Sequence, residues 1–252
     1  MAAAPSIAEL RAVTQPASIF ARNSGEHWAG RLYVRRFSPY LTRLLLRTPI
    51  TPDGVTWLMI LTGLAAAAAL TLPGLGGAIL AVALIQLQIL LDCSDGELAR
   101  WLDRRSPAGI FLDRIGHWTT ETALPIALGI RADGGWDQMG TYTTLGLLVA
   151  VLVLLVKGES ALVTVARAES GRPVADDTAE VATPSASGLR RLRRGLGYLP
   201  FFRAFVAMEF TLLALAAELA DATDVLVVAL IPIAAITAAG HLVAILASQR
   251  LR

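Results

Sequence analysis

The run GVTWLMILTGLAAAAALTLPGLGGAILAVALIQLQILL, residues 54–91, decides the class of fold, because its 38 residues include no Asp, Glu, Lys or Arg. A helix of about 20 apolar residues is long enough to cross a bilayer. Pro73 and the glycines beside it mark a turn within the run. The run therefore predicts two membrane-spanning helices joined by a tight loop.

The composition of the whole chain also indicates a membrane protein. Hydrophobic residues make up 55% of the 252 residues and charged residues 17%, whereas soluble domains carry roughly 25% charged residues. So much apolar sequence excludes disorder for most of the chain. The single cysteine, Cys93, excludes an internal disulfide framework and a cysteine-rich zinc site. We expect no nucleic-acid partner.

The apolar segments predict an all-α, polytopic membrane protein with six transmembrane helices. We expect these helices at residues 55–72, 76–101, 108–130, 140–166, 199–220 and 223–248. Before them we expect a polar cytosolic arm, residues 1–35, followed by one membrane domain, residues 36–248. Within that domain a polar cytosolic loop, residues 167–195, separates the fourth and fifth helices.

The segment RFSPYLTRLLLRTPI, residues 36–50, alternates leucines with arginines and predicts an N-terminal amphipathic juxtamembrane helix. Basic amphipathic helices of this kind lie in the membrane interface, in contact with membrane lipids. A helix that packs on the protein's own cytosolic face would show the same pattern. Both placements therefore stay open at this point.

The arginines are distributed unequally between the two sides of the predicted membrane domain. Almost all of them fall in the segments expected on one side, which are 1–54, 101–107, 167–198 and 249–252. The opposite loops, 72–76, 131–139 and 219–224, hold one cation, Arg131. Because basic residues stay on the cytoplasmic side, we predict both termini in the cytoplasm and a location in the cell membrane. The abundance of arginine and alanine indicates a bacterial source.

One run of basic residues in the polar loop allows two interpretations. The run consists of Arg190, Arg191, Arg193 and Arg194. It is typical of a plain topology determinant and, equally, of a site that binds anionic lipid.

A cluster of acidic residues interrupts the apolar pattern where the second and third predicted helices approach the cytosol. Asp92 and Asp95 are three residues apart, Asp113 and His117 are four apart, and Glu121 extends the second line. Each spacing places side chains on one helix face. A carboxylate near the centre of a membrane helix costs about 2.5 kcal/mol or more, so these groups should be paired, metal-bound or at a wet mouth.

The chemistry of this cluster indicates a metal and a phosphate ligand. Oxygen ligands suit Mg²⁺, Mn²⁺ or Ca²⁺ rather than a soft metal. The small side chains of Gly96 and Ala99 leave room for a ligand to approach the backbone, and Arg100 supplies a fixed cation for a phosphate.

The order Asp92-x2-Asp95-Gly96-x2-Ala99-Arg100-x8-Gly109-x3-Asp113 resembles the motif of the CDP-alcohol phosphotransferases, also called CDP-alcohol phosphatidyltransferases. The upstream segment Thr48–Thr56 resembles the entry to the first helix of that family, where an Asn usually stands at the position of Asp53. Six helices are also similar to the family fold, and the resemblance covers roughly residues 36–248.

The resemblance implies an integral membrane transferase. Such an enzyme moves a phosphoalcohol or phosphatidyl group from a CDP-linked donor to an alcohol acceptor and releases CMP, as in phospholipid or related lipid and glycan-phosphate synthesis. By resemblance, one or two Mg²⁺ or Mn²⁺ ions are bound by Asp92, Asp95 and Asp113, and the CDP pocket is shaped by Gly96, Ala99, Arg100 and Gly109. Family members are commonly dimers, so a homodimer is an expectation as well.

His117 stands where the family normally has its last motif aspartate, the presumed general base. The imidazole can take the acceptor proton, because its ordinary pKa is about 6.5, and Glu121 one turn later would orient it. His117 can instead be a metal ligand or a spacer. In a third interpretation the site has lost the family chemistry.

Two cations outside the motif are candidates for binding a phosphorylated acceptor. Lys157 is the single lysine and lies in the fourth predicted helix, and Arg203 opens the fifth. They predict an anion pocket. An ion pair inside the membrane, between Lys157 and either Glu159 or Glu209, explains the lysine equally well.

A second class of function stays open beside the enzyme. A non-catalytic member of the family would serve as a membrane scaffold or a lipid-binding protein. The retention of Asp92, Asp95 and Asp113 favours the enzyme, because buried carboxylates are costly to keep without a use. A transporter is disfavoured by the cytosolic position of the acids and by the lack of visible inverted repeats.

Overall fold

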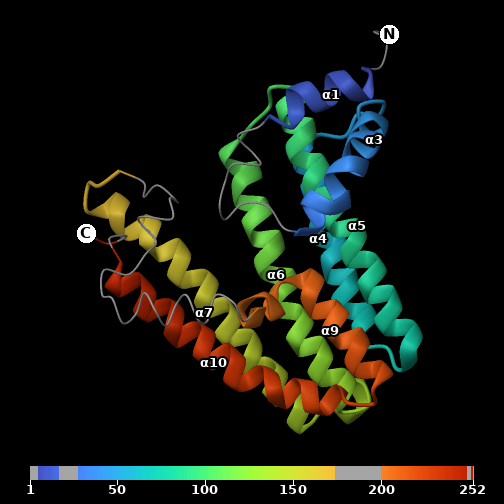
Figure 1. The fold of residues 1–252 in the computed structure, drawn as a ribbon, viewed down its shortest axis with the longest axis vertical. Coiled ribbons are helices and arrows are strands. Elements are labelled where there is room, and N and C mark those ends of the chain that lie inside the picture. The colour runs from blue at the N-terminus through green and yellow to red at the C-terminus, as the bar shows by residue number, and fades with distance from the viewer. Residues whose placement is uncertain (1–4, 17–27, 174–199, 249–250, 252) are drawn as a thin grey trace. The chain divides into compact units, whose positions relative to one another are not determined.

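The computed structural model describes residues 5–16, 28–173, 200–248 and 251, and within these residues the chain is helical and contains no strand (Figure 1). The elements are α1 (Ile7–Thr14), the π-helical turn η1 (Gly30–Val34), α3 (Arg35–Leu45), α4 (Pro52–Leu70), α5 (Gly74–Trp101), α6 (Pro107–Ala132), the 3₁₀ turn η2 (Trp136–Gln138), α7 (Thr141–Glu169), the 3₁₀ turn η3 (Pro200–Phe205), α9 (Ala207–Leu219) and α10 (Thr223–Ala247).

Four of these helices are long and apolar enough to cross a membrane, namely α4, α5, α7 and α10. Within the residues that the structure describes, they support an all-helical, multi-pass membrane protein, and their ends fall within three residues of the predicted ones. Helix α6 is less apolar than these four and contains Asp113, Arg114, Glu121 and Arg131, and α9 has only 13 residues. The count of six spans therefore remains a prediction.

The predicted helix 199–220 differs most from the structure. The chain there forms the short turn η3 and then α9, and the two are separated by Val206, whose backbone is extended (φ −74°, ψ 133°). Apolar composition alone does not report such a break. The arginine run at 190–194 and most of the polar loop lie outside the described residues.

The described chain forms two compact units. Unit 1 comprises Met1–Ala66 and Val82–Thr120, and unit 2 comprises Ala67–Ala81 and Glu121–Arg252. Helices α4, α5 and α6 each contribute one part to each unit. The N-terminal stretch that was expected to be a polar arm contains α1 and η1, which belong with unit 1.

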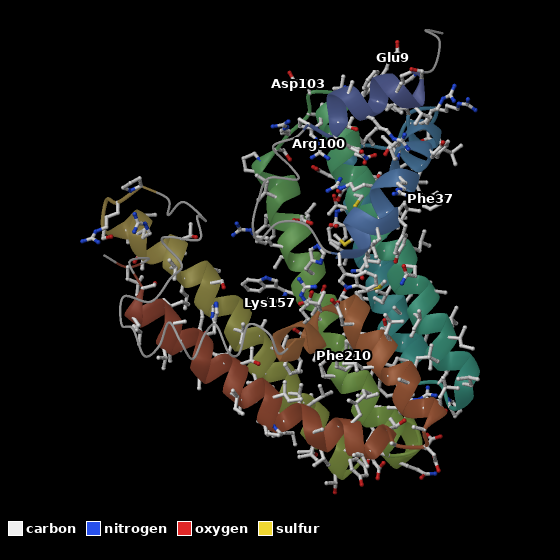
Figure 2. All side chains as sticks on the ribbon, viewed as in Figure 1. Glu9, Phe37, Arg100, Asp103, Lys157 and Phe210 are labelled. Carbon is white, nitrogen blue, oxygen red and sulfur yellow. The ribbon has the colours of Figure 1, made fainter. Side chains whose placement is uncertain are left out.

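Helix α3 of unit 1 faces its own unit with both hydroxyl and leucine side chains, because Leu41 and Leu45 pack against the buried core of that unit. Ser38 and Thr42 are fully buried, whereas Phe37, Tyr40 and Leu44 are each more than half exposed. Figure 2 shows Phe37 pointing away from the helices of this unit. The segment therefore packs on its own unit through hydroxyl groups and leucines together, and Phe37, Tyr40 and Leu44 lie on its exposed side.

The core of unit 1 joins α4 to α5 through one cluster of buried side chains, Val55, Met59, Ile60, Leu91 and Leu98. Helix α6 reaches α4 at Gly116, where a Cβ atom would lie 2.7 Å from Met59 Cε. Gln88 Nε2 of α5 donates a hydrogen bond of 2.9 Å to Thr120 Oγ1 of α6. These contacts hold the three helices that carry the motif.

Arg131 connects the turn between α4 and α5 to α9 within unit 2. Its buried guanidinium donates hydrogen bonds to the carbonyl oxygens of Leu70 at the end of α4, Leu72 in the turn and Gly74 at the start of α5. It also forms an ion pair of 2.8 Å with Glu218 of α9. Carbonyls at a helix end lack intrahelical partners. The cation that sequence analysis placed in an outer loop thus ties the α4–α5 turn to α9.

Asp133 caps the start of α7. Its carboxylate accepts hydrogen bonds of 2.7 to 3.1 Å from the backbone amides of Gly140, Tyr142 and Thr143, groups that a helix N-terminus leaves unpaired. Partial burial raises the pKa of Asp133, but the hydrogen bonds from Thr143, Gly140 and Tyr142 lower it by more. The pKa of this carboxyl consequently lies below its ordinary value.

Helices α6 and α7 cross closely at two glycines. A Cβ atom on Gly146 would overlap the carbonyl oxygen of Pro125, and one on Gly129 would overlap that of Tyr142. Small residues of this kind let membrane helices approach along their backbones. Further along, His241 Nδ1 of α10 lies 2.8 Å from Glu159 Oε2 of α7, which agrees with a structural role for this histidine.

Gly146→Ala should destabilise the protein, because the new methyl group meets backbone that cannot move aside. We expect a loss of about 1–3 kcal/mol, as in overpacked cores, measured as a lower midpoint of thermal unfolding in detergent. Gly158→Ala on the same helix is the matched control, since no atom lies within 4 Å of its Cβ position. An unfolding midpoint that falls equally in both variants would contradict the close crossing.

Candidate functional site

The motif lies where α5 ends and α6 begins, in unit 1. Helix α5 continues without a break through the acidic cluster to Trp101, and α6 starts at Pro107, a residue suited to a first helical position. Ser106 Oγ accepts the backbone N–H of Gly109 at 2.9 Å and thereby caps α6. The short turn brings two helix faces together in antiparallel order, so residues far apart in sequence meet.

Three motif side chains meet between these helices. His117 Nε2 lies 3.1 Å from Asp92 Oδ1 and 3.5 Å from Asp113 Oδ1. One ligand atom from each residue lies within 4.8 Å of the other two, a spacing that could hold a metal ion. All three side chains are partly exposed, so a ligand can reach them.

The donor set of this cluster fits a divalent ion of the hard or borderline kind. Two carboxylates and one imidazole suit Mn²⁺, and carboxylates with water suit Mg²⁺. Of the three metal ligands that the resemblance implied, the structure brings Asp92 and Asp113 together, with His117 beside them. The hydrogen bond between Gln88 and Thr120 lies one turn from Asp92 on α5 and fixes the register of the two helices.

Asp95 occupies a different environment from Asp92. Its carboxylate is only 8% exposed and accepts a hydrogen bond of 2.7 Å from Thr56 Oγ1 of α4. Asp95 is not part of the three-residue cluster. Thr56, which sequence analysis quoted but gave no role, thus orients one of the motif aspartates.

The residues expected to shape the CDP pocket lie on the same two helices. At Gly96 a Cβ atom would come within 3.2 Å of the Arg100 guanidinium, and at Gly109 within 3.0 Å of Asp53 Oδ1. Ala99 is partly exposed beside them. Side chains at the two glycines would therefore crowd Arg100 and Asp53, which explains why these positions need to be small.

Glu121 and Lys157 form an ion pair within unit 2, Oε2 to Nζ (Figure 2 labels the lysine). The partner of Lys157 is therefore neither Glu159 nor Glu209, the two that sequence analysis had weighed. Arg203 is an exposed residue of η3. The predicted roles of Glu121 toward His117, and of Lys157 and Arg203 toward an acceptor, stay predictions.

Sequence reasoning assigned no role to Glu97, which lies inside the motif directly after Gly96. It is 0% exposed and accepts hydrogen bonds from Ser38 Oγ at 2.5 Å, Thr42 Oγ1 at 2.7 Å and Gln15 Nε2 at 2.8 Å. The signal available in the sequence was an unexplained carboxylate one position beyond Gly96, on a helix that is apolar for most of its length.

Taken together, the fold and site define a multi-pass helical membrane protein with a carboxylate and imidazole cluster at the end of one long helix. The family model for CDP-alcohol phosphatidyltransferase matches residues 49–239, or 191 of 252 residues, and the chain belongs to this family. The family comprises membrane transferases that take a phosphoalcohol group from a CDP-alcohol, generally with a divalent metal. No curated protein matches the chain.

Asp92→Asn and His117→Ala should each weaken the binding of Mn²⁺ to the purified protein by about tenfold or more, because losing one ligand of a metal removes a large part of its binding free energy. Electron paramagnetic resonance of free Mn²⁺ measures the effect. Asp103→Asn is the control, since Asp103 is exposed in the turn between α5 and α6. Unchanged Mn²⁺ affinity in both test variants would exclude a metal at this cluster.

Proposed function

We propose that the protein is a divalent-metal-dependent CDP-alcohol phosphotransferase. The observation that supports this most directly is the meeting of Asp92, Asp113 and His117 inside the region that matches the family. In the proposed reaction, the hydroxyl oxygen of the acceptor bonds to the phosphorus that carries the donor alcohol. The bond from that phosphorus to the CMP oxygen breaks, CMP leaves, and the hydroxyl proton passes to a base.

In this proposal Asp92, Asp113 and His117 hold the ion, and Asp95 stands beside them in an orientation set by Thr56. A bound Mg²⁺ or Mn²⁺ would neutralise the charge of the donor pyrophosphate. Arg100 supplies a further cation, whose guanidinium lies against Gly96. A guanidinium held in one position recognises phosphate oxygens well.

We propose the role of metal ligand for His117 in preference to general base. The same atom, Nε2, faces both Asp92 and Asp113, which is the arrangement of a ligand set. Glu121, which would have oriented the imidazole as a base, forms an ion pair with Lys157. For Lys157, the contact with Glu121 supports an ion pair more than it supports an acceptor pocket shared with Arg203.

The function is tested by CMP release from purified protein with a set of CDP-alcohol donors, including CDP-diacylglycerol, and candidate alcohols. We expect release with Mg²⁺ or Mn²⁺, none in excess EDTA, and recovery when the metal is restored. Asp95→Asn should lower turnover at least about 10²-fold, as the loss of a positioned charge does. CMP release that persists in EDTA would contradict the metal, and no release from any donor would favour the non-catalytic scaffold.

The same assay separates the two roles of His117. As a ligand, His117→Ala raises the Mn²⁺ concentration needed for half-maximal rate, and saturating Mn²⁺ restores much of the turnover. As a base, the variant keeps its metal requirement and loses about 10²–10⁴-fold in turnover at any metal concentration.

We further propose that the cluster faces the cytoplasm of a bacterial cell, that both termini lie on that side, and that the product is a phospholipid or related lipid. In a six-span arrangement α6 and α9 complete the membrane domain beside the four apolar helices. The outward apolar face of α3 would then lie in the membrane interface, with its arginines near lipid headgroups.

Cysteine labelling tests this orientation in a Cys93→Ala background. A cysteine replacing Asp137 should react with a membrane-impermeant maleimide in intact cells, and one replacing Arg104 should react only after the cells are opened. Both positions are exposed, so access to solvent is matched. Labelling of position 104 in intact cells would reverse the orientation and the side of the proposed active site.

A further inference from the structure

The N-terminal segment of unit 1, residues 5–16 and 28–45, lies outside the matched region 49–239 yet bonds directly to the motif. Two residues of α5, Glu97 and Arg100, form hydrogen bonds with this segment. Glu97 accepts hydrogen bonds from this segment, and Arg100 Nε donates one of 2.7 Å to the carbonyl oxygen of Thr14. Figure 2 shows Arg100 near the end of α5 at which α1 lies.

Glu97 gathers three separate parts of this segment at one carboxylate. Gln15 comes from the end of α1, while Ser38 and Thr42 come from successive turns of α3. Arg35 adds an ion pair at 3.7 Å. A carboxylate with no exposed surface is strongly destabilising unless its oxygens accept hydrogen bonds. The buried position of Glu97 therefore depends on these donors.

The position of this anchor determines what it can affect. Glu97 follows Gly96 directly and precedes Arg100 by three residues, and both of these neighbours are expected in the CDP pocket. The Arg100 guanidinium lies over Gly96 while its Nε is held by Thr14. Movement of the N-terminal segment would therefore move Arg100, the cation that we propose binds the donor phosphates.

We propose that Glu97 is a positioning residue and that the N-terminal segment it anchors forms one wall of the donor site; the inference rests on the function proposed above. The anchor acts through Arg100 and the backbone at Gly96, not by touching the reacting atoms. Its effect falls on the binding of the CDP group. The metal cluster of Asp92, Asp113 and His117 contains none of these residues, so we expect it to keep its affinity for Mn²⁺.

The test measures the dissociation constant of CDP, with Mn²⁺ present, for the wild type and two variants in detergent. Ser38→Ala/Thr42→Val removes two donors and leaves the whole motif intact, and Glu97→Gln keeps one carbonyl acceptor and should give a smaller effect. We expect the double variant to bind CDP about tenfold more weakly, as the loss of one or two buried hydrogen bonds implies. Glu9→Gln is the control, since that exposed residue caps α1 by bonding to Ser6.

Steady-state kinetics add a measurement, the donor KM, that would not change if Glu97 had only a structural role. The donor KM should rise with the CDP dissociation constant, while kcat at saturating donor and the Mn²⁺ concentration for half-maximal rate stay within about threefold of the wild type. A lower unfolding midpoint with unchanged CDP affinity would make Glu97 a structural anchor only and overturn the proposal.

Measurements on the wild-type protein distinguish failure of the Glu97 proposal from failure of the proposed transferase function. If wild-type protein fails to bind CDP, the proposed function falls and the donor wall falls with it. If it binds CDP but releases no CMP from any donor, the transferase is contradicted, and weaker CDP binding by the double variant still supports the role of Glu97.

Discussion

Charge buried in membrane-spanning helices is costly, and the arrangement of this protein depends on how each buried charge is stabilised. Glu97 is stabilised by hydroxyl and amide donors, Arg131 by backbone carbonyls and a carboxylate, and Glu159 by an imidazole. Asp92 and Asp113 meet at His117 and stay partly exposed. Glu97, Arg131 and Glu159 hold helices together, whereas Asp92, Asp113 and His117 keep ligand atoms accessible.

Small residues set the distances at which these charges can meet. Gly116 lets α6 contact Met59 of α4, and Gly63 leaves room for the hydrogen bond between Gln88 and Thr120. Larger side chains at these two positions would overlap their neighbours and force the helices to shift. The geometry of the acidic cluster is thus a consequence of close backbone packing one turn away.

Hydropathy predicted the long helices well, since burial in lipid depends on composition more than on partners. The spacing of Asp92, Asp113 and His117 predicted a shared site because a short turn leaves two helix faces few ways to meet. Spacing could not predict that Glu121 pairs with Lys157, or that Glu97 binds α3, because the rotation of each helix and the choice among several oppositely charged partners are set by packing.

The exposed apolar side chains of α3 have a consequence for how the protein behaves outside a bilayer. Its hydroxyl groups are satisfied inside the unit, so the apolar face formed by Phe37, Tyr40 and Leu44 depends on its surroundings for cover. Lipid, detergent and water would each contact this exposed face differently. The helix is also bonded to Glu97 of α5, the residue next to Gly96. We expect the choice of solubilising medium to alter nucleotide affinity more than metal affinity, so preparations in nanodiscs and in short-chain detergents need not be equivalent.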